Sequence, residues 1–249
     1  MDYREFHRRT IAEPEAYWAE QAELIEWKDK PKQILDKSRL PFTRWFVGGT
    51  TNLCHNAIDR WLPTQADKPA LIYISTEVGP EQGTERTWTF AQLATEVNRM
   101  AATLQSLGVG KGDRVLLYMP MIPEATFAML ACARIGAIHS VAFGGFASVS
   151  LANRIEDAEP AVIISADAGE RAGKVIPYKP LLDEGIERSS HKPKAVLLVD
   201  RGLSKWNRVE GRDHDYATAS KPHANAQVPV TWLESNEPSY ILYTSGTTG

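Results

Sequence analysis

Short apolar runs alternate with amphipathic helical patterns through the middle of this chain, and this alternation is the strongest constraint on its fold. Strands are expected at Arg114–Met119, Ala137–Phe143, Ala161–Ser165 and Ala195–Asp200. Helices are expected between them at Pro123–Ile135, Ser148–Ala158 and around Leu181–Arg188. Near-continuous apolar strands are typical of a sheet that is buried on both faces and whose strands run parallel. The pattern therefore predicts an α/β fold with a mostly parallel sheet flanked by helices.

The rest of the chain divides around this region. Strands at Ala70–Ile74 and Arg86–Thr89 precede a helix from Phe90 to Leu107, which Gly108 ends. The first 68 residues hold four of the seven tryptophans, and such a segment more often packs on a domain surface than lines a ligand site. Four parts are predicted: an N-terminal extension 1–68, an alternating α/β subdomain 69–200, a polar surface connection 201–238, and a strand with a loop at 239–249.

Composition limits the classes of partner. The chain has 249 residues, of which 43% are hydrophobic and 24% are charged, as in ordinary globular proteins. A net charge of -3 from interspersed signs gives no basic face, so neither a nucleic acid nor a membrane is an expected partner. The N-terminus lacks the apolar stretch of a signal peptide, and Cys54 and Cys132 fit reduced, buried thiols. These features predict a cytoplasmic protein.

The last ten residues form an apolar strand that runs into a loop of Ser, Thr and Gly. Such a loop lets backbone N–H groups and hydroxyls surround phosphate oxygens. It is not a Walker A motif, because that motif needs Gly-Lys-Ser/Thr after a first glycine. A flexible polar tail is the alternative interpretation. The candidate phosphate-binding residues are Thr244, Ser245, Gly246, Thr247, Thr248 and Gly249.

Two other glycine-containing segments follow predicted strands. Phe143-Gly144-Gly145-Phe146 could let a ligand approach the backbone, or could simply be a tight turn. In Asp167–Lys174, Arg171 and Lys174 could grip a phosphate, or could belong to a solvated loop. Gly108–Asp113 follows a helix and precedes a strand, so it is a helix cap and not a dinucleotide fingerprint.

Metal and hydrolase chemistry find no support in the sequence. None of the six histidines has the spacing of a metal site or of a catalytic triad. Neither Gly-x-Ser-x-Gly nor His-Glu-x-x-His occurs. No metal ligand and no catalytic residue is assigned within these residues.

Several motifs together resemble the short-chain acyl-CoA synthetases of the acyl-adenylate-forming superfamily. The terminal string Tyr-Thr-Ser-Gly-Thr-Thr-Gly is similar to the superfamily's phosphate-binding signature, which usually continues to Pro-Lys-Gly. Further similar stretches are Trp45–Gly49, Asn52–Arg60, Tyr118–Ala125 and Ala131–Ser140. The resemblance implies the front part of the large N-terminal domain of such an enzyme.

Three further stretches bear on the acid that is activated. Cys54-His55-Asn56, Ser165–Gly169 and Leu197–Gly202 look most similar to the propionate-activating members of the family. The acetate-activating members are the close alternative. The acyl pocket itself has no counterpart in these residues.

The resemblance implies an acid–thiol ligase that uses ATP with Mg²⁺ and coenzyme A, and no tightly bound prosthetic group. Residues Thr244–Gly249 would hold the ATP phosphates. The coenzyme A nucleotide would lie at Arg171, Ala172, Gly173 and Lys174, with its pantetheine arm beside Gly145. The superfamily's metal-coordinating acid and C-terminal catalytic lysine have no counterpart here, so these 249 residues alone are expected to be inactive.

Two other classes stay open. A carrier-protein-loading adenylating module would not bind free coenzyme A and would leave Arg171 and Lys174 without a ligand. A truncated binding protein would lack catalysis altogether. The coding sequence after Gly249 would distinguish them, because an enzyme should continue with Pro-Lys-Gly and several hundred further residues.

Overall fold

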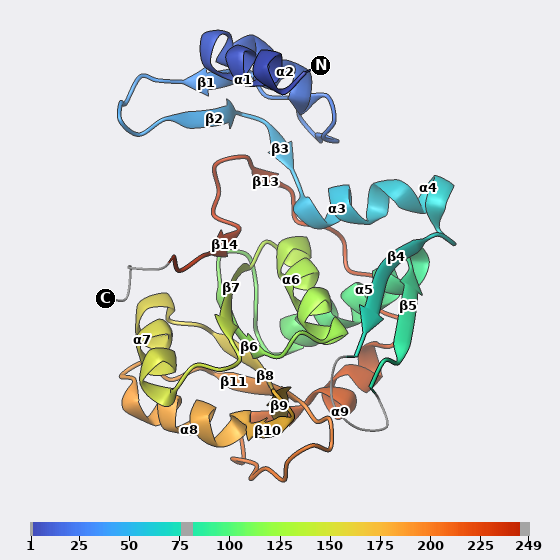
Figure 1. The fold of residues 1–249 in the computed structure, drawn as a ribbon, viewed down its shortest axis with the longest axis vertical. Coiled ribbons are helices and arrows are strands. Elements are labelled where there is room, and N and C mark those ends of the chain that lie inside the picture. The colour runs from blue at the N-terminus through green and yellow to red at the C-terminus, as the bar shows by residue number, and fades with distance from the viewer. Residues whose placement is uncertain (1, 76–81, 245–249) are drawn as a thin grey trace.

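A six-stranded parallel sheet forms the centre of the computed structural model, which describes residues 2–75 and 82–244. The strand order is β12-β11-β8-β6-β7-β14, and all neighbours run parallel (Figure 1). The strands are β6 (Arg114–Met119), β7 (Ile138–Phe143), β8 (Val162–Ala166), β11 (Ala195–Val199), β12 (Asp213–Asp215) and β14 (Tyr240–Ile241). The predicted α/β class with a parallel sheet is confirmed.

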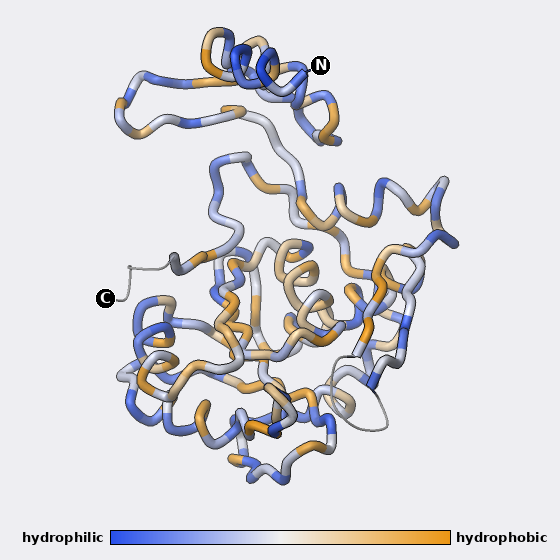
Figure 2. The backbone as a smooth tube through the Cα atoms, in the orientation of Figure 1, coloured by the Kyte–Doolittle hydropathy of each residue, from blue (hydrophilic) through white to orange (hydrophobic). Residues whose placement is uncertain are grey.

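Helices cover both faces of this sheet. One face packs against α5 (Phe90–Ser106) and α6 (Pro123–Ile135), and the other against α7 (Ser148–Ala158) and α8 (Tyr178–Arg188). Successive residues of one strand enter different cores: Leu117 joins the first and Leu116 the second, and both are fully buried. Figure 2 shows these strands as mostly apolar segments inside a more polar periphery. Burial on both faces explains why β6, β8 and β11 are apolar without alternation.

The helix ends follow from local chemistry. Thr89 and Gln92 form a capping box at the start of α5, with Gln92 donating its backbone N–H to the Thr89 hydroxyl. Pro123 occupies the first turn of α6, and Gly136 ends that helix in the left-handed conformation at φ 74°. The predicted boundaries of α6 and α7 agree with the structure. In contrast, α8 begins three residues before its predicted start.

Residues 2–75 contribute strands to three two-stranded sheets. The helices α1 (Tyr3–Ala12) and α2 (Pro14–Ala22) lie beside a hairpin of β1 (Gln33–Asp36) and β2 (Arg44–Val47) (Figure 1). After them come β3 (Thr50–Thr51), α3 (Leu53–Ala57), η1 (Asp59–Trp61), α4 (Leu62–Gln65) and β4 (Pro69–Ile74), which pairs with β5 (Glu85–Thr89). Antiparallel pairing of β3 with β13 (Leu233–Glu234) ties this region to the end of the chain.

The aromatic residues of this region pack against one another. The Trp18 and Trp45 rings lie 6.1 Å apart, and the Trp27 and Phe46 rings 5.7 Å apart. Three of them, Trp18, Trp27 and Phe46, also line an open pocket of about 460 Å³. The rings therefore pack against one another and also form part of the pocket wall.

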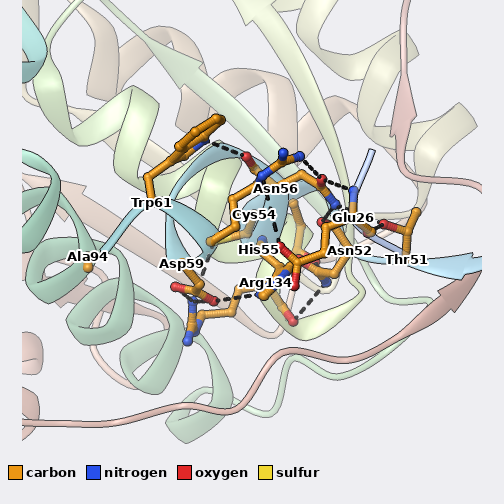
Figure 3. A network of polar contacts seen from close by, with 12 residues as sticks. Glu26, Thr51, Asn52, Cys54, His55, Asn56, Asp59, Trp61, Ala94 and Arg134 are labelled. Carbon is orange, nitrogen blue, oxygen red and sulfur yellow. Dashed lines mark hydrogen bonds and ion pairs between the residues drawn. The ribbon is translucent and has the colours of Figure 1, made fainter. Parts of the chain in front are cut away.

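A polar network holds α3, η1 and the end of α6 together (Figure 3). The Asn52 amide donates to the carbonyls of Ala133 (2.7 Å) and Thr231 (2.8 Å). The Arg134 guanidinium lies 3.0 Å from each carboxylate oxygen of Asp59 and also donates to the Val228 carbonyl. Cys54, beside Arg134, is buried, and burial raises the pKa of its thiol to about 11. Cys132 is likewise buried, in agreement with the sequence.

The stretch expected as a surface connection contains regular elements. These are the edge strand β12, α9 (Tyr216–Ser220), η2 (Lys221–His223) and β13. An apolar pattern could not reveal β12, because its buried residue Asp213 is charged. Burial alone would raise the pKa of Asp213, but hydrogen bonds from Arg212 and Lys179 hold it below its ordinary value.

Glu156 joins the end of α7 to the end of α8 and gives the fold a pH dependence. Its carboxylate accepts hydrogen bonds from the hydroxyls of Ser190 and Ser189 and from the Ser190 backbone N–H, which lower its pKa from 4.5 to about 2. A carboxyl group whose pKa is lower in the folded state stabilises that state at pH values above its unfolded-state pKa. This stability is lost as the pH falls toward and through the folded-state pKa. The stability difference between wild type and Glu156→Gln should be complete at pH 6 and should shrink steadily below pH 4.5 in thermal unfolding. A difference that stays constant down to pH 3 would contradict this.

Candidate functional site

Three segments with candidate binding residues leave the same edge of the central sheet. The Gly144–Ala147 segment follows β7, the hairpin 168–177 follows β8, and Thr244 follows β14. Because β7, β8 and β14 are all parallel to β6 or to each other, their carboxyl ends meet at one edge. Ligands of open parallel sheets bind in crevices at this edge. The Gly144–Ala147 segment, the hairpin 168–177 and Thr244 are therefore brought to one side of the molecule.

The segment 168–177 is a β-hairpin and not the open loop that the sequence suggested. Strands β9 (Ala168–Arg171) and β10 (Lys174–Pro177) pair antiparallel around a two-residue turn. The turn residues Ala172 and Gly173 have φ angles of 50° and 74°. Positive values at both positions define the turn type that suits the twist of a hairpin.

This hairpin places two cations side by side. Arg171 and Lys174 are direct partners across the strands, so their side chains lie on the same face, and both are exposed. Like charges at directly opposite positions are unfavourable in a hairpin. Within residues 2–75 and 82–244, neither cation forms an ion pair with an acidic side chain. An anionic ligand on this face would remove the repulsion.

Gly145 lies next to Arg171. A Cβ atom placed on Gly145 would lie 3.2 Å from Nη1 of Arg171 and 2.6 Å from the Phe143 ring. The guanidinium carbon of Arg171 lies 5.6 Å from the centroid of that same ring. The Phe143 ring and the Arg171 guanidinium therefore occupy the space that a side chain at position 145 would need, and only glycine lets the exposed backbone of Gly145 lie against them.

Asp167 fixes the base of the hairpin. Its fully buried carboxylate accepts hydrogen bonds from the backbone N–H groups of Arg201 (3.1 Å), Leu203 (2.7 Å) and Ser204 (2.9 Å). The Arg201 side chain donates to the Ala168 carbonyl at 3.3 Å. These bonds hold segment 201–204 against the start of β9. No role for Asp167 was predicted from the sequence, although its position directly after the buried strand β8 marks it as a residue at the sheet's carboxyl edge.

The strand that leads into the terminal loop is short. Only Tyr240 and Ile241 pair with β7, opposite His139 and Ser140. The Tyr243 hydroxyl donates to Asp157 of α7, and the Arg154 guanidinium lies over the Tyr243 ring at 4.8 Å. These contacts hold Tyr243 against α7. The candidate residues Ser245, Gly246, Thr247, Thr248 and Gly249 lie outside the described residues.

Neither a metal centre nor a membrane span is found in the described part of the chain. Residues 2–75 and 82–244 contain no cluster of three or more His, Cys, Asp or Glu side chains able to hold a metal ion. No helix within these residues has the length and apolarity needed to cross a bilayer.

Comparison with known proteins identifies the class. Residues 58–249 match the family of AMP-binding enzymes, and residues 3–57 match the acetyl-coenzyme A synthetase N-terminus. The chain belongs to the AMP-binding enzyme family. It is similar over 100% of its length to an acetoacetyl-CoA synthetase from Streptomyces lividans, with a TM-score of 0.86, 28% identity and 37% of that chain covered.

Particular relatives are closer in sequence. The chain is 63% identical to a propionate–CoA ligase of Salmonella typhimurium and 61% identical to one of Escherichia coli, in each case over all of this chain and 39% of the relative. It is 42% identical to an acetyl-coenzyme A synthetase of Beijerinckia indica, over 99% of this chain and 38% of the relative. The chain thus spans about two fifths of the length of these relatives. The predicted resemblance to short-chain acyl-CoA synthetases is confirmed.

Proposed function

We propose that this chain is the N-terminal part of an AMP-forming acid–thiol ligase that joins propionate to coenzyme A. In the first step a propionate oxygen attacks the α-phosphorus of Mg·ATP, and the bond to the departing pyrophosphate breaks. In the second step the sulfur of coenzyme A attacks the carbonyl carbon of propionyl-AMP. The bond to AMP then breaks, the thiol proton is released, and propionyl-CoA is the product.

The observation that carries this proposal is the meeting of Gly145 and Arg171 at the edge of the sheet from which β14 also leads toward the terminal loop. Coenzyme A has phosphates at one end and a thin pantetheine arm. Phosphates suit the Arg171 fork and the Lys174 ammonium, and the arm suits an exposed glycine backbone. Ala172 and Gly173 add no side chain larger than a methyl group at the turn, which keeps the approach to both cations open.

The terminal loop would serve the first step. Thr244–Gly249 would surround the β- and γ-phosphates of ATP with N–H and O–H donors as negative charge develops on pyrophosphate. Mg²⁺ enters with ATP as part of the substrate. We further propose that the protein acts in the cytoplasm, where ATP and coenzyme A are both present, with these small molecules and neither a nucleic acid nor a membrane as its partners.

Propionate is proposed over acetate because identity is 63% and 61% with the propionate–CoA ligases and 42% with the acetyl-coenzyme A synthetase. In the full-length protein, propionate should exceed acetate in kcat/KM by about ten- to hundredfold, since one methylene in an apolar pocket contributes about 1–3 kcal/mol. Competition between the two acids at equal concentration, with product thioesters separated by chromatography, measures this ratio. Preference for acetate would overturn the assignment of propionate, and absence of any carboxylate-dependent pyrophosphate exchange would overturn the ligase itself.

A further inference from the structure

The Tyr178 hydroxyl lies between two glycines from different segments of the candidate site. A Cβ on Gly144 would lie 2.1 Å from this hydroxyl oxygen, and a Cβ on Gly169 would lie 2.4 Å from it. Both distances are far shorter than any real contact of a Cβ atom. The phenol therefore occupies the space that side chains at positions 144 and 169 would need. Only glycine at both positions lets the two backbones close on the ring.

Tyr178 is itself held firmly. It is the first residue of α8, only 6% exposed, and its backbone N–H donates to the Asp167 carbonyl at 2.9 Å. Its ring centroid lies 4.8 Å from that of Tyr118 on β6. The Tyr118 hydroxyl in turn donates to the Phe146 carbonyl at 3.1 Å. The two tyrosines thus connect the segment after β7 with the hairpin after β8.

The residues proposed to contact coenzyme A lie close to these two glycines in the sequence. Gly145 follows Gly144, and Arg171 lies two residues after Gly169 on the same strand. The thickness of the phenol sets how far apart the two backbones lie, and hence the gap between Gly145 and the guanidinium. Binding geometry of this kind is sensitive, because a displacement of about 1 Å can reduce the rate by roughly a hundredfold.

We propose that Tyr178 is a positioning residue for coenzyme A: it keeps the Gly144–Gly145 backbone and the Arg171–Lys174 hairpin at the separation at which one coenzyme A molecule contacts both. This rests on the coenzyme A site of the proposed function. In this scheme Tyr178 acts through the segment after β7 and the hairpin after β8, which would hold coenzyme A and not ATP or the acid. Its effect is therefore confined to the thioester-forming step.

The test is Tyr178→Ala in the full-length protein. The KM for coenzyme A should rise about tenfold, while propionate-dependent pyrophosphate exchange, which needs no coenzyme A, should stay within twofold of wild type. Tyr216→Ala is the matched control, because Tyr216 is also 6% exposed but packs in the core on the other face of the sheet. The control should lower the melting temperature and leave the KM for coenzyme A unchanged. Equal loss of both half-reactions in Tyr178→Ala, or no change in the KM, would overturn the positioning role.

Gly169→Ala supplies a second measurement that does not depend on Tyr178→Ala being stable. Alone it should raise the KM for coenzyme A, because the new methyl displaces the phenol. Combined with Tyr178→Ala it should add no further rise, because the methyl then enters vacated space. Additive increases, or a Gly169→Ala variant with the wild-type KM, would overturn the proposal. Arg171→Ala tests the coenzyme A site separately from the role of Tyr178. If Arg171→Ala leaves the KM for coenzyme A unchanged, the proposed coenzyme A site is wrong. If Arg171→Ala raises this KM and Tyr178→Ala does not, only the positioning role of Tyr178 is wrong.

Discussion

Arg171→Ala in the full-length protein is expected to raise the KM for coenzyme A by about ten- to hundredfold and to leave propionate-dependent pyrophosphate exchange near wild type. The guanidinium would lose a charge-assisted hydrogen bond to a phosphate, worth about 1.5–3 kcal/mol. Adenylation does not involve coenzyme A, so the exchange reaction does not depend on this contact. Initial rates at varied coenzyme A concentration, and exchange of labelled pyrophosphate into ATP, measure the two half-reactions separately.

Two further variants sharpen this test. Arg188 is an exposed arginine on α8 that pairs with Glu184 at 2.6 Å, and Arg188→Ala should change neither half-reaction. Thr247→Ala should have the reverse effect of Arg171→Ala, slowing exchange with less effect on the KM for coenzyme A. If Arg171→Ala behaves like Arg188→Ala, the hairpin is only a solvated surface. Equal damage to both half-reactions would instead mean that the substitution disturbed the fold.

The elements that bury apolar residues could be predicted from the sequence. Helix α6 begins at Pro123 and ends before Gly136, and its apolar residues recur at helical spacing, so both boundaries follow from local chemistry. The strands β6, β8 and β11 were visible because both of their faces are buried, and β7 because it is apolar even where Val141 and Phe143 are exposed. Parallel pairing followed from the helices that separate them.

The elements that bury few apolar residues could not be predicted. Strand β12 has the sequence Asp-His-Asp, and Asp213 is buried only because Arg212 and Lys179 pair with it. The hairpin 168–177 looked like a loop because its strands have four residues each, and only Gly173 marked its turn. Whether such strands form depends on charged partners that are distant in sequence, and a single sequence does not show which charged residues will pair.

The candidate site, too, could be predicted from the sequence only in part. The spacing of Arg171 and Lys174 suggested a phosphate contact, but their direct opposition depends on the turn at Ala172 and Gly173. The approach of Arg171 to Gly145 depends on the order of β7, β6 and β8 in the sheet. Tyr178 gave no signal of its own, because its importance lies in two glycines that come from different segments.

Arg134→Ala is expected to destabilise the chain by about 3–5 kcal/mol, the cost of removing one partner of a buried ion pair. Arg134 is 7% exposed and lies 3.0 Å from both oxygens of the Asp59 carboxylate, so its loss leaves a largely buried acid without its guanidinium partner. The substitution would also remove the bond to the Val228 carbonyl and so loosen α6 from two segments distant in sequence. Urea unfolding followed by tryptophan fluorescence measures the change.

The double variant Asp59→Asn with Arg134→Met shows whether the loss comes from the unpaired acid or from packing. Replacing both partners removes the buried charges together, so the double variant should be more stable than Arg134→Ala. Arg188→Ala, which breaks an exposed pair on α8, should cost less than about 1 kcal/mol. A loss in Arg134→Ala no larger than in Arg188→Ala would contradict the role given to the pair. A double variant as unstable as Arg134→Ala would shift the cost from charge burial to the packing of the arginine stem between α6, η1 and the segment around Val228.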